Sequence, residues 1–150
     1  MNGVLFTPLK RIQTVRGDVL HAIKASDQGF ESFGEAYFSI VANGAVKGWK
    51  RHRRMVMNLI VPVGEVKFVL HDARDAIWQP GVFESFVMSP KSRETYGRLT
   101  VPPGVWMAFT SLAEGLNMVL NVASIEHDPE EADNVPLDAI PYDWPANGSC

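Results

Sequence analysis

The sequence predicts an all-β domain, a barrel built from two packed sheets, and three observations indicate it. The chain has 150 residues, of which 46% are hydrophobic and 21% charged, and this suits one domain with a single hydrophobic core. Ten prolines and twelve glycines interrupt it at short intervals and do not cluster into linkers. Between them lie short segments rich in β-branched and aromatic residues, and no segment shows sustained helical periodicity. We therefore expect a single domain over residues 1–150.

Eight short segments are the expected strands. They are residues 19–23, 36–41, 58–63, 66–71, 83–88, 99–101, 105–110 and 118–125. Residues 59–61 and 118–120 are apolar at successive positions, which is typical of strands that face a barrel interior on one side and a second sheet or subunit on the other. A homodimer is therefore expected. Residues 26–34 and 128–132 are each expected to form a helical turn or two.

Composition and charge exclude several classes of protein. A formal net charge of -3 argues against a dedicated nucleic-acid binder, which is normally basic. No apolar run approaches the roughly 20 residues that a membrane helix needs, and the N-terminus lacks the pattern of a secretory signal, so we expect a cytoplasmic protein. The single cysteine, Cys150, excludes an internal disulfide and a metal site built from cysteines.

One stretch of the chain has a specific spacing. Residues 44–64 begin and end with glycine, and between them the positions of Lys50, His52 and Met57 match the three ligand positions of the first cupin motif, which metal-binding members fill with His, His and Glu. Residues 97–111 resemble the second cupin motif, with Met107 at the position of its last histidine. This resemblance implies a cupin-type double-stranded β-helix, the jelly-roll barrel, with short helical turns.

The residues at these four positions predict a site without a metal ion. Divalent ions are held by imidazole nitrogens and carboxylate oxygens, and one ammonium, one imidazole and two thioethers do not form such a set. We therefore expect no metal and no other cofactor. Lys50 instead places a positive charge roughly where the ion would lie, which suits an anionic substrate or a developing enolate.

Two metal-free groups of cupins resemble the chain. Segments similar to the dTDP-4-dehydrorhamnose 3,5-epimerase family are residues 15–17, 33–35, 46–49, 64–66, 72–74 and 101–106, within a resemblance that spans residues 16–129. The Arg-Gly-x-His-x-His segment of the dTDP-sugar 3,4-ketoisomerases aligns with residues 47–52. The resemblance implies an epimerase or isomerase of a nucleotide-diphosphate keto-sugar in surface-polysaccharide synthesis, with a dTDP-linked sugar as its partner and neither nucleic acid nor membrane.

The chain departs from the epimerase pattern at three positions. Lys50 stands where that family has its catalytic base, Met107 where it has a second histidine, and Asn121 at or near its acidic tyrosine. His52 corresponds to the second histidine of the ketoisomerase pattern. A non-catalytic sugar-nucleotide or carbohydrate binder that has lost the epimerase residues is therefore the alternative function, and a metal-dependent cupin oxygenase or isomerase is a third.

Strand alternation relates the candidate catalytic residues. Unless a bulge intervenes, it places Gly48, Lys50, His52 and Arg54 on one face and Lys47, Trp49, Arg51 and Arg53 on the other. His52 is then the candidate base, with the Lys50 ammonium lowering its pKa and stabilising the enolate. Tyr37 is the candidate replacement for the missing acid. The alternatives are a structural histidine and a tyrosine that only forms part of a wall.

The candidate binding residues follow from local charge and from the resemblance. Six of the eight residues 47–54 are Lys, Arg or His, a cluster that matches a diphosphate. The resemblance assigns Arg16 and Lys47 to the nucleotide and phosphates, and Glu35 to the region of the sugar pocket. Arg54 and Arg74 are further candidates.

For these residues too, a structural interpretation stands beside the functional one. A basic cluster is often a solvated face paired with acidic residues, and Arg74 belongs to an Asp-x-Arg segment that equally suits a structural ion pair with Asp72. The acidic run 128–133 is expected to be a solvated helical start.

Overall fold

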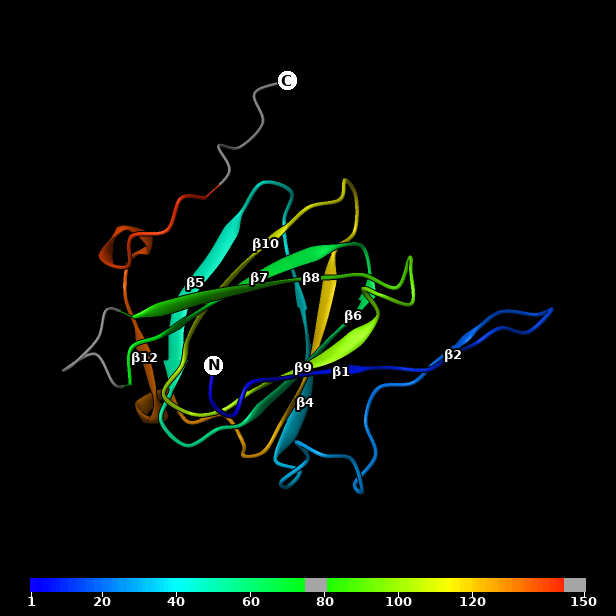
Figure 1. The fold of residues 1–150 in the computed structure, drawn as a ribbon, viewed down its shortest axis with the longest axis horizontal. Coiled ribbons are helices and arrows are strands. Elements are labelled where there is room, and N and C mark those ends of the chain that lie inside the picture. Colours follow the sequence, from blue (N-terminus) through cyan, green and yellow to red (C-terminus); the bar gives the residue numbers. More distant parts are fainter. Residues whose placement is uncertain (75–80, 145–150) are drawn as a thin grey trace.

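The computed structural model describes residues 1–74 and 81–144, which form two facing five-stranded antiparallel sheets and a small hairpin (Figure 1). The first sheet has the strand order β1 (Leu5–Pro8), β9 (Gly97–Val101), β6 (Met57–Val63), β11 (Met118–Ala123) and β4 (Glu35–Ile40). The second has the order β12 (Ala132–Asn134), β5 (Val46–His52), β10 (Trp106–Ser111), β7 (Val66–Asp72) and β8 (Val82–Met88). The hairpin pairs β2 (Arg11–Ile12) with β3 (Val19–Leu20), and two short 3₁₀ helices, η1 (Pro129–Glu131) and η2 (Leu137–Ala139), lie near the C-terminus.

The all-β prediction is confirmed, and most expected strands lie within two residues of their predicted bounds. Within the described residues, 26–34 form turns and no helix, while 128–132 contain the single turn η1. The short strands β1, β2 and β12 were not predicted. Strand β12 has only three residues, two of them polar, and forms by pairing with β5. Cys150 lies outside the described residues. Within the described part of the chain, no helix has the length and apolarity needed to cross a membrane.

The main core lies between the two sheets, where alternate residues of each strand point inward. Met57, Leu59 and Val61 of β6 face Phe68 and Leu70 of β7, and all are almost completely buried. Burying side chains of this kind contributes about 1.5–3 kcal/mol each. The packed core leaves a hollow toward β4 and β5, which the next subsection describes.

The C-terminal segment covers the outer face of the second sheet. Trp49 is fully buried there against Val69, Ala108 and Ile140, and its indole Nε1 donates a hydrogen bond to the Leu137 carbonyl at 3.2 Å. This packing fixes β5, the strand that carries the basic cluster, from its outer side.

Arg98 is fully buried on the outer face of the first sheet and holds residues 22–28 against it. Its Nη1 donates to the Ala22 carbonyl at 3.2 Å and to Asp27 Oδ2 at 2.9 Å, and its Nη2 donates to the Gln28 carbonyl at 2.9 Å. We expect Arg98→Ala to lower the free energy of unfolding by about 2–4 kcal/mol, because it removes a fully buried side chain and its three hydrogen bonds to the Asp27 carboxylate and the Ala22 and Gln28 carbonyls.

Urea denaturation measures this loss, and Arg11→Ala is the control. Arg11 pairs with Asp18 at 2.5 Å on the exposed hairpin, where an ion pair contributes about 0–1 kcal/mol. Equal effects of the two substitutions would contradict the structural role of Arg98.

Candidate active site

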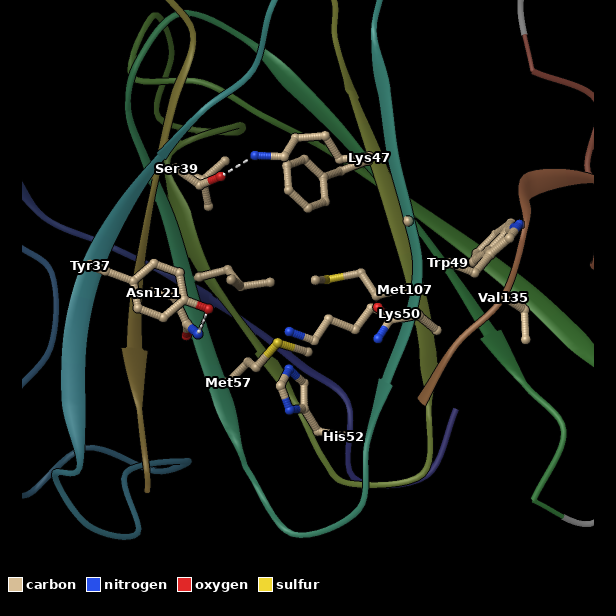
Figure 2. A pocket seen from close by; sticks show the side chains of 15 residues that line it. Tyr37, Ser39, Lys47, Trp49, Lys50, His52, Met57, Met107, Asn121 and Val135 are labelled. Atoms are coloured by element: carbon tan, nitrogen blue, oxygen red, sulfur yellow. Dashed lines mark hydrogen bonds between the residues drawn. The ribbon is translucent and has the colours of Figure 1, made fainter. Parts of the chain in front are cut away.

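A cavity of about 330 Å³ lies between the two sheets, next to the main core (Figure 2). Strands β4, β6 and β11 form one wall, and β5 and β10 form the other, with Asn134 at the end of β12 and the following Val135 also lining the cavity. Its lining is largely apolar, and the polar side chains that reach it are Tyr37, Ser39, Lys47, Lys50, His52, Asn121 and Asn134. An apolar pocket with a few convergent polar groups is the usual form of a small-molecule site.

A β-bulge in β5 determines which basic residues enter the cavity. Lys47 pairs with Phe109 and Lys50 with Met107, so that Gly48 and Trp49 together oppose the single residue Ala108. Gly48 has a φ of +135°, and a Cβ there would lie 2.5 Å from the Cβ of Ala108, so only glycine fits.

The bulge corrects the prediction from strict alternation. That prediction placed Lys47 on the face opposite Lys50 and His52, and it is wrong because the extra residue returns Lys47 to the same side. Lys47, Lys50 and His52 all line the cavity, whereas the Trp49 side chain points to the outer face (Figure 2).

The four positions of the cupin ligand set meet in the cavity as the motif spacing predicts. Lys50, His52, Met57 and Met107 all line it (Figure 2). An ammonium, an imidazole and two thioethers do not fit a divalent ion. In residues 1–74 and 81–144, no group of three or more His, Cys, Asp or Glu side chains is placed to hold one.

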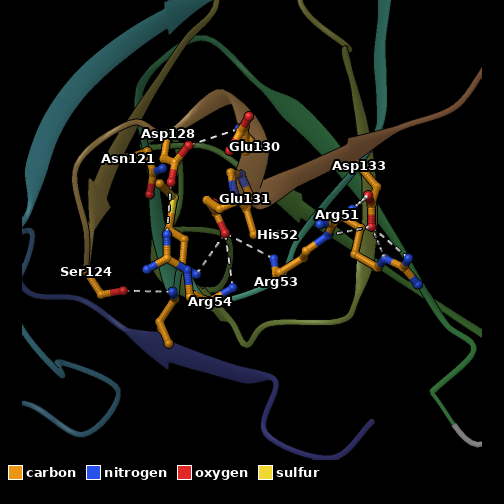
Figure 3. A network of polar contacts seen from close by, with 12 residues as sticks. Arg51, His52, Arg53, Arg54, Asn121, Ser124, Asp128, Glu130, Glu131 and Asp133 are labelled. Carbon is orange, nitrogen blue, oxygen red and sulfur yellow. Dashed lines mark hydrogen bonds and ion pairs between the residues drawn. The ribbon is translucent and has the colours of Figure 1, made fainter.

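His52 is buried, at 4% exposure, and its Nδ1 forms a hydrogen bond with Glu131 Oε1 (Figure 3). Glu131 is 3% exposed, and its Oε2 accepts hydrogen bonds from the backbone N–H groups of Arg53 at 3.1 Å, Arg54 at 3.0 Å and Met55 at 3.4 Å. Burial raises the pKa of Glu131, but the hydrogen bonds from His52 and from the backbone outweigh it, so the net shift is downward.

Glu131 corrects the expectation that residues 128–133 form a solvated helical start. The chain folds back after η1, and β12 pairs Ala132 with His52 and Asp133 with Arg51, which brings Glu131 under the end of β5. A possible signal in the sequence was charge complementarity between the acidic run 128–133 and the basic run 51–54. The pairing of segments about 80 residues apart, however, is not visible in local sequence.

The electrostatics of His52 favour a neutral imidazole. Burial lowers its pKa, Glu131 opposes this by its hydrogen bond and charge, and the charges of Lys50 and His127 lower the pKa further, with a net downward shift from 6.5. With Nδ1–H donated to the carboxylate, Nε2 is the nitrogen left for the cavity.

The other basic residues of β5 and the following turn do not line the cavity and instead form ion pairs with Asp128 and Asp133 (Figure 3). Arg51 and Arg53 both form ion pairs with Asp133, at 2.7 Å and 2.5 Å. The hydrogen bond from Arg53, followed by that from Arg51, lowers the pKa of Asp133 to about 2. Arg54 pairs with Asp128 at 3.0 Å, and its side chain is exposed. Of the basic run 47–54, only Lys47, Lys50 and His52 line the cavity.

The opposite wall carries a polar pair. Tyr37 of β4 and Asn121 of β11 are direct cross-strand neighbours, and Asn121 Nδ2 donates a hydrogen bond to the Tyr37 hydroxyl at 3.1 Å (Figure 2). Farther along the cavity, Lys47 Nζ donates to Ser39 Oγ at 2.6 Å and to the Ile40 carbonyl at 3.3 Å.

Besides Arg54, three candidate binding residues lie away from the cavity. Glu35 begins β4 and is half-buried, but it is not among the lining residues. Arg74 pairs with Asp72 at 2.6 Å and donates to the Asn2 carbonyl at 2.6 Å. Arg16 lies in the turn of the β2–β3 hairpin, which projects from the barrel (Figure 1).

The whole chain is similar to known sugar-nucleotide enzymes. No protein-family model matches the chain. The crystal structure of a dTDP-sugar isomerase from Desulfovibrio desulfuricans G20 has 34% sequence identity and a TM-score of 0.88, over 95% of this chain and 91% of that one. A probable low-salt glycan biosynthesis epimerase, Agl13 of Haloferax volcanii, is 24% identical over 130 residues, which is 85% of this chain and 80% of the relative.

Two further structures share the fold. The dTDP-4-dehydrorhamnose 3,5-epimerase from Sulfolobus tokodaii has 21% identity and a TM-score of 0.81, over 97% of this chain and 82% of that one. The 3,4-ketoisomerase QdtA from Thermoanaerobacterium thermosaccharolyticum has 19% identity and a TM-score of 0.69, over 89% and 88%, in a complex with TDP-4-keto-6-deoxyglucose. The predicted resemblance to both groups is confirmed.

Proposed function

Because the chain belongs to the family of the dTDP-sugar isomerase from Desulfovibrio desulfuricans, we propose that it epimerises or isomerises a dTDP-linked keto-sugar by proton transfer next to the ketone, without a metal ion. The observation that carries this proposal is the buried His52–Glu131 pair, whose histidine lines the same cavity as Lys50. The name of Agl13 supports a place in glycan synthesis.

The reaction begins at His52. Its Nε2 removes the acidic proton from the carbon next to the ketone, and the electron pair of that C–H bond moves onto the ketone oxygen to give an enolate. Glu131 holds Nδ1–H and stabilises the imidazolium that forms. Lys50 supplies a positive charge inside the same apolar cavity, where charge stabilisation of the enolate is strongest.

The proton returns from one of two groups. Tyr37 lies on the β4 wall and His52 on the β5 wall, so a proton from the Tyr37 hydroxyl reaches the sugar from a different side than the one that His52 deprotonates. Return to the same carbon from the opposite face is an epimerisation. In an isomerisation, the hydroxyl on the deprotonated carbon gives its proton to the enolate oxygen, and His52 returns its proton to the former carbonyl carbon, so that the ketone and the hydroxyl exchange places.

Lys47 is proposed to bind the diphosphate. It is exposed, and Ser39 and the Ile40 carbonyl hold its ammonium at the side of the cavity. We expect Lys47→Met to raise KM about 10-fold or more with little change in kcat, because a phosphate contact present in both ground and transition states acts on binding. Steady-state kinetics measure this split, with Arg53→Met as the control. A fall in kcat at unchanged KM would contradict the assignment.

Deuterium exchange tests the proposed function. Incubation with dTDP-4-keto-6-deoxyglucose in deuterated water is expected to place deuterium on a ring carbon next to the ketone, detected by mass spectrometry and NMR. Calorimetric binding of this and related sugar nucleotides without exchange would instead support the alternative, a sugar-nucleotide binder without catalysis.

We also propose a homodimer, supported by two exposed apolar regions. Phe38 and Ile40 point outward from β4, an edge strand, and are 62% and 60% exposed. The projecting hairpin exposes Ile12 and Val19 and carries Arg16 at its turn. In the proposed dimer, we expect Arg16 to contact the nucleotide bound by the partner subunit.

Light scattering should therefore give twice the chain mass of 16.6 kDa. The double substitution F38E/I40E is expected to produce monomers, because it places charges in the apolar contact. A wild-type protein that remains monomeric at micromolar concentration would contradict the dimer.

A further inference from the structure

Two methionine side chains line the cavity together with His52. Met57 lies on β6 of the first sheet and Met107 on β10 of the second, and they are 3% and 6% exposed. Their side chains and the His52 ring, from β5, extend into the same part of the cavity (Figure 2). The other methionines, all within the described residues, do not line it. The cavity therefore brings together two thioether sulfurs and one imidazole.

The His52 imidazole has the arrangement of a metal-binding histidine. Its Nδ1 is bonded to the Glu131 carboxylate, so Nε2 is the nitrogen left for the cavity. Metal-binding histidines usually give their second ring N–H to a carboxylate or carbonyl, which orients the ring and makes the binding nitrogen more basic. Glu131 is in turn held by three backbone N–H groups, so the orientation of the ring is fixed.

This set of donors selects a soft, monovalent cation. Divalent ions do not fit it, but polarizable thioether sulfurs together with imidazole suit Cu(I), and Ag(I) shares its charge and its preference for sulfur. Lys50 repels any cation in the cavity, and by Coulomb's law a monovalent ion meets half the repulsion of a divalent one. Among the described residues that line the cavity, no Asp or Glu offsets this charge.

We propose that His52 Nε2, Met57 Sδ and Met107 Sδ form a binding site for a soft monovalent metal ion, Cu(I) or Ag(I). The ion occupies the nitrogen that the proposed function uses as the base, so it acts as an inhibitor and not as a cofactor. The metal site itself does not depend on that function, because it requires only the three donor atoms in one cavity.

Calorimetric titration with silver nitrate in chloride-free buffer tests the site. A Cys150→Ser background is used throughout, because a free thiol also binds silver. We expect Met57→Leu and Met107→Leu each to raise the Kd for silver about 10- to 100-fold. Leucine and methionine have similar volumes, so the fold should survive. Met118→Leu is the matched control and should keep the Kd of the background, because Met118 is half-buried on β11 and does not line the cavity.

Lys50→Met should have the opposite effect in the same titration. The substitution removes the repelling charge and adds a third thioether to the cavity, so we expect it to lower the Kd for silver about 10-fold or more. Mere damage to the cavity would weaken binding. A gain in affinity at this position therefore identifies the cavity as the place where the ion binds.

NMR spectra of the methionine ε-methyl groups locate the ion without relying on a change in affinity. Silver should shift the signals of Met57 and Met107 and leave that of Met118 in place. Unmoved signals of Met57 and Met107, an unchanged Kd in both leucine variants, or weaker binding by Lys50→Met would each overturn the metal site. Deuterium exchange measured without metal tests the proposed function separately, so failure of one proposal leaves the other standing.

Discussion

Replacement of His52 by asparagine is expected to lower kcat/KM by about 10³- to 10⁴-fold, because the proposed reaction has no other imidazole to remove the proton. His52 is the only histidine among the residues that line the cavity, within the part of the chain that the structure describes. Asparagine keeps a polar group that can donate to Glu131, so the fold should survive. The measurement is the initial rate of deuterium exchange, with circular dichroism to confirm folding.

His21→Asn is the matched control for this prediction. His21 is half-buried beside the β2–β3 hairpin, and its backbone carbonyl, which the substitution keeps, accepts the hydrogen bond from the Tyr96 hydroxyl at 2.7 Å. Its exchange rate should stay within a factor of about two of the wild type. A His52→Asn protein that keeps a tenth of the wild-type rate would remove His52 from the role of base.

Replacement of Glu131 by glutamine is expected to lower kcat/KM by about 10²- to 10⁴-fold, because the amide no longer holds the imidazole in the required tautomer or stabilises the imidazolium. The substitution should also move the acid limb of the pH profile. Glu131 raises the pKa of His52 against the dominant effect of burial, so its loss lowers that pKa further. Since the neutral imidazole is the active base, the acid limb should shift to lower pH.

The substitution Lys50→Met is expected to shift the acid limb of the pH profile in the opposite direction. The charge of Lys50 lowers the pKa of His52, so its removal should move the acid limb to higher pH while kcat falls. The log of kcat/KM plotted against pH for both variants measures the two shifts. Shifts in the same direction would show that Glu131 and Lys50 do not act on the titration of His52 as proposed.

Protein stability should depend on pH through the same pair. The folded pKa of His52 lies below the 6.5 of the unfolded chain, so the unfolded state binds more protons between these values. The free energy of unfolding therefore falls as the pH drops below about 6.5. The lowered pKa of Glu131 adds a second loss at more acidic pH, as that carboxylate becomes protonated.

Local sequence determined the fold class and the place of the site. Short segments rich in β-branched and aromatic residues, bounded by glycines and prolines, identify most strands. The spacing from Gly44 to Gly64 brings Lys50, His52 and Met57 to one cavity, because the spacing of residues along a strand determines which side chains share a face. The same spacing also predicts His52 as the candidate base.

Only the tertiary structure decided the partners of those residues. The bulge at Gly48 moved Lys47 into the cavity, and bulges depend on close contact with a neighbouring strand, here Ala108. Glu131 was missed as a contributor to the site, because β12 meets β5 across about 80 residues of chain. The residue pattern within a strand indicates which face of the sheet a side chain occupies. Hydrogen bonds between distant segments, however, form only where the folded backbone brings those segments together.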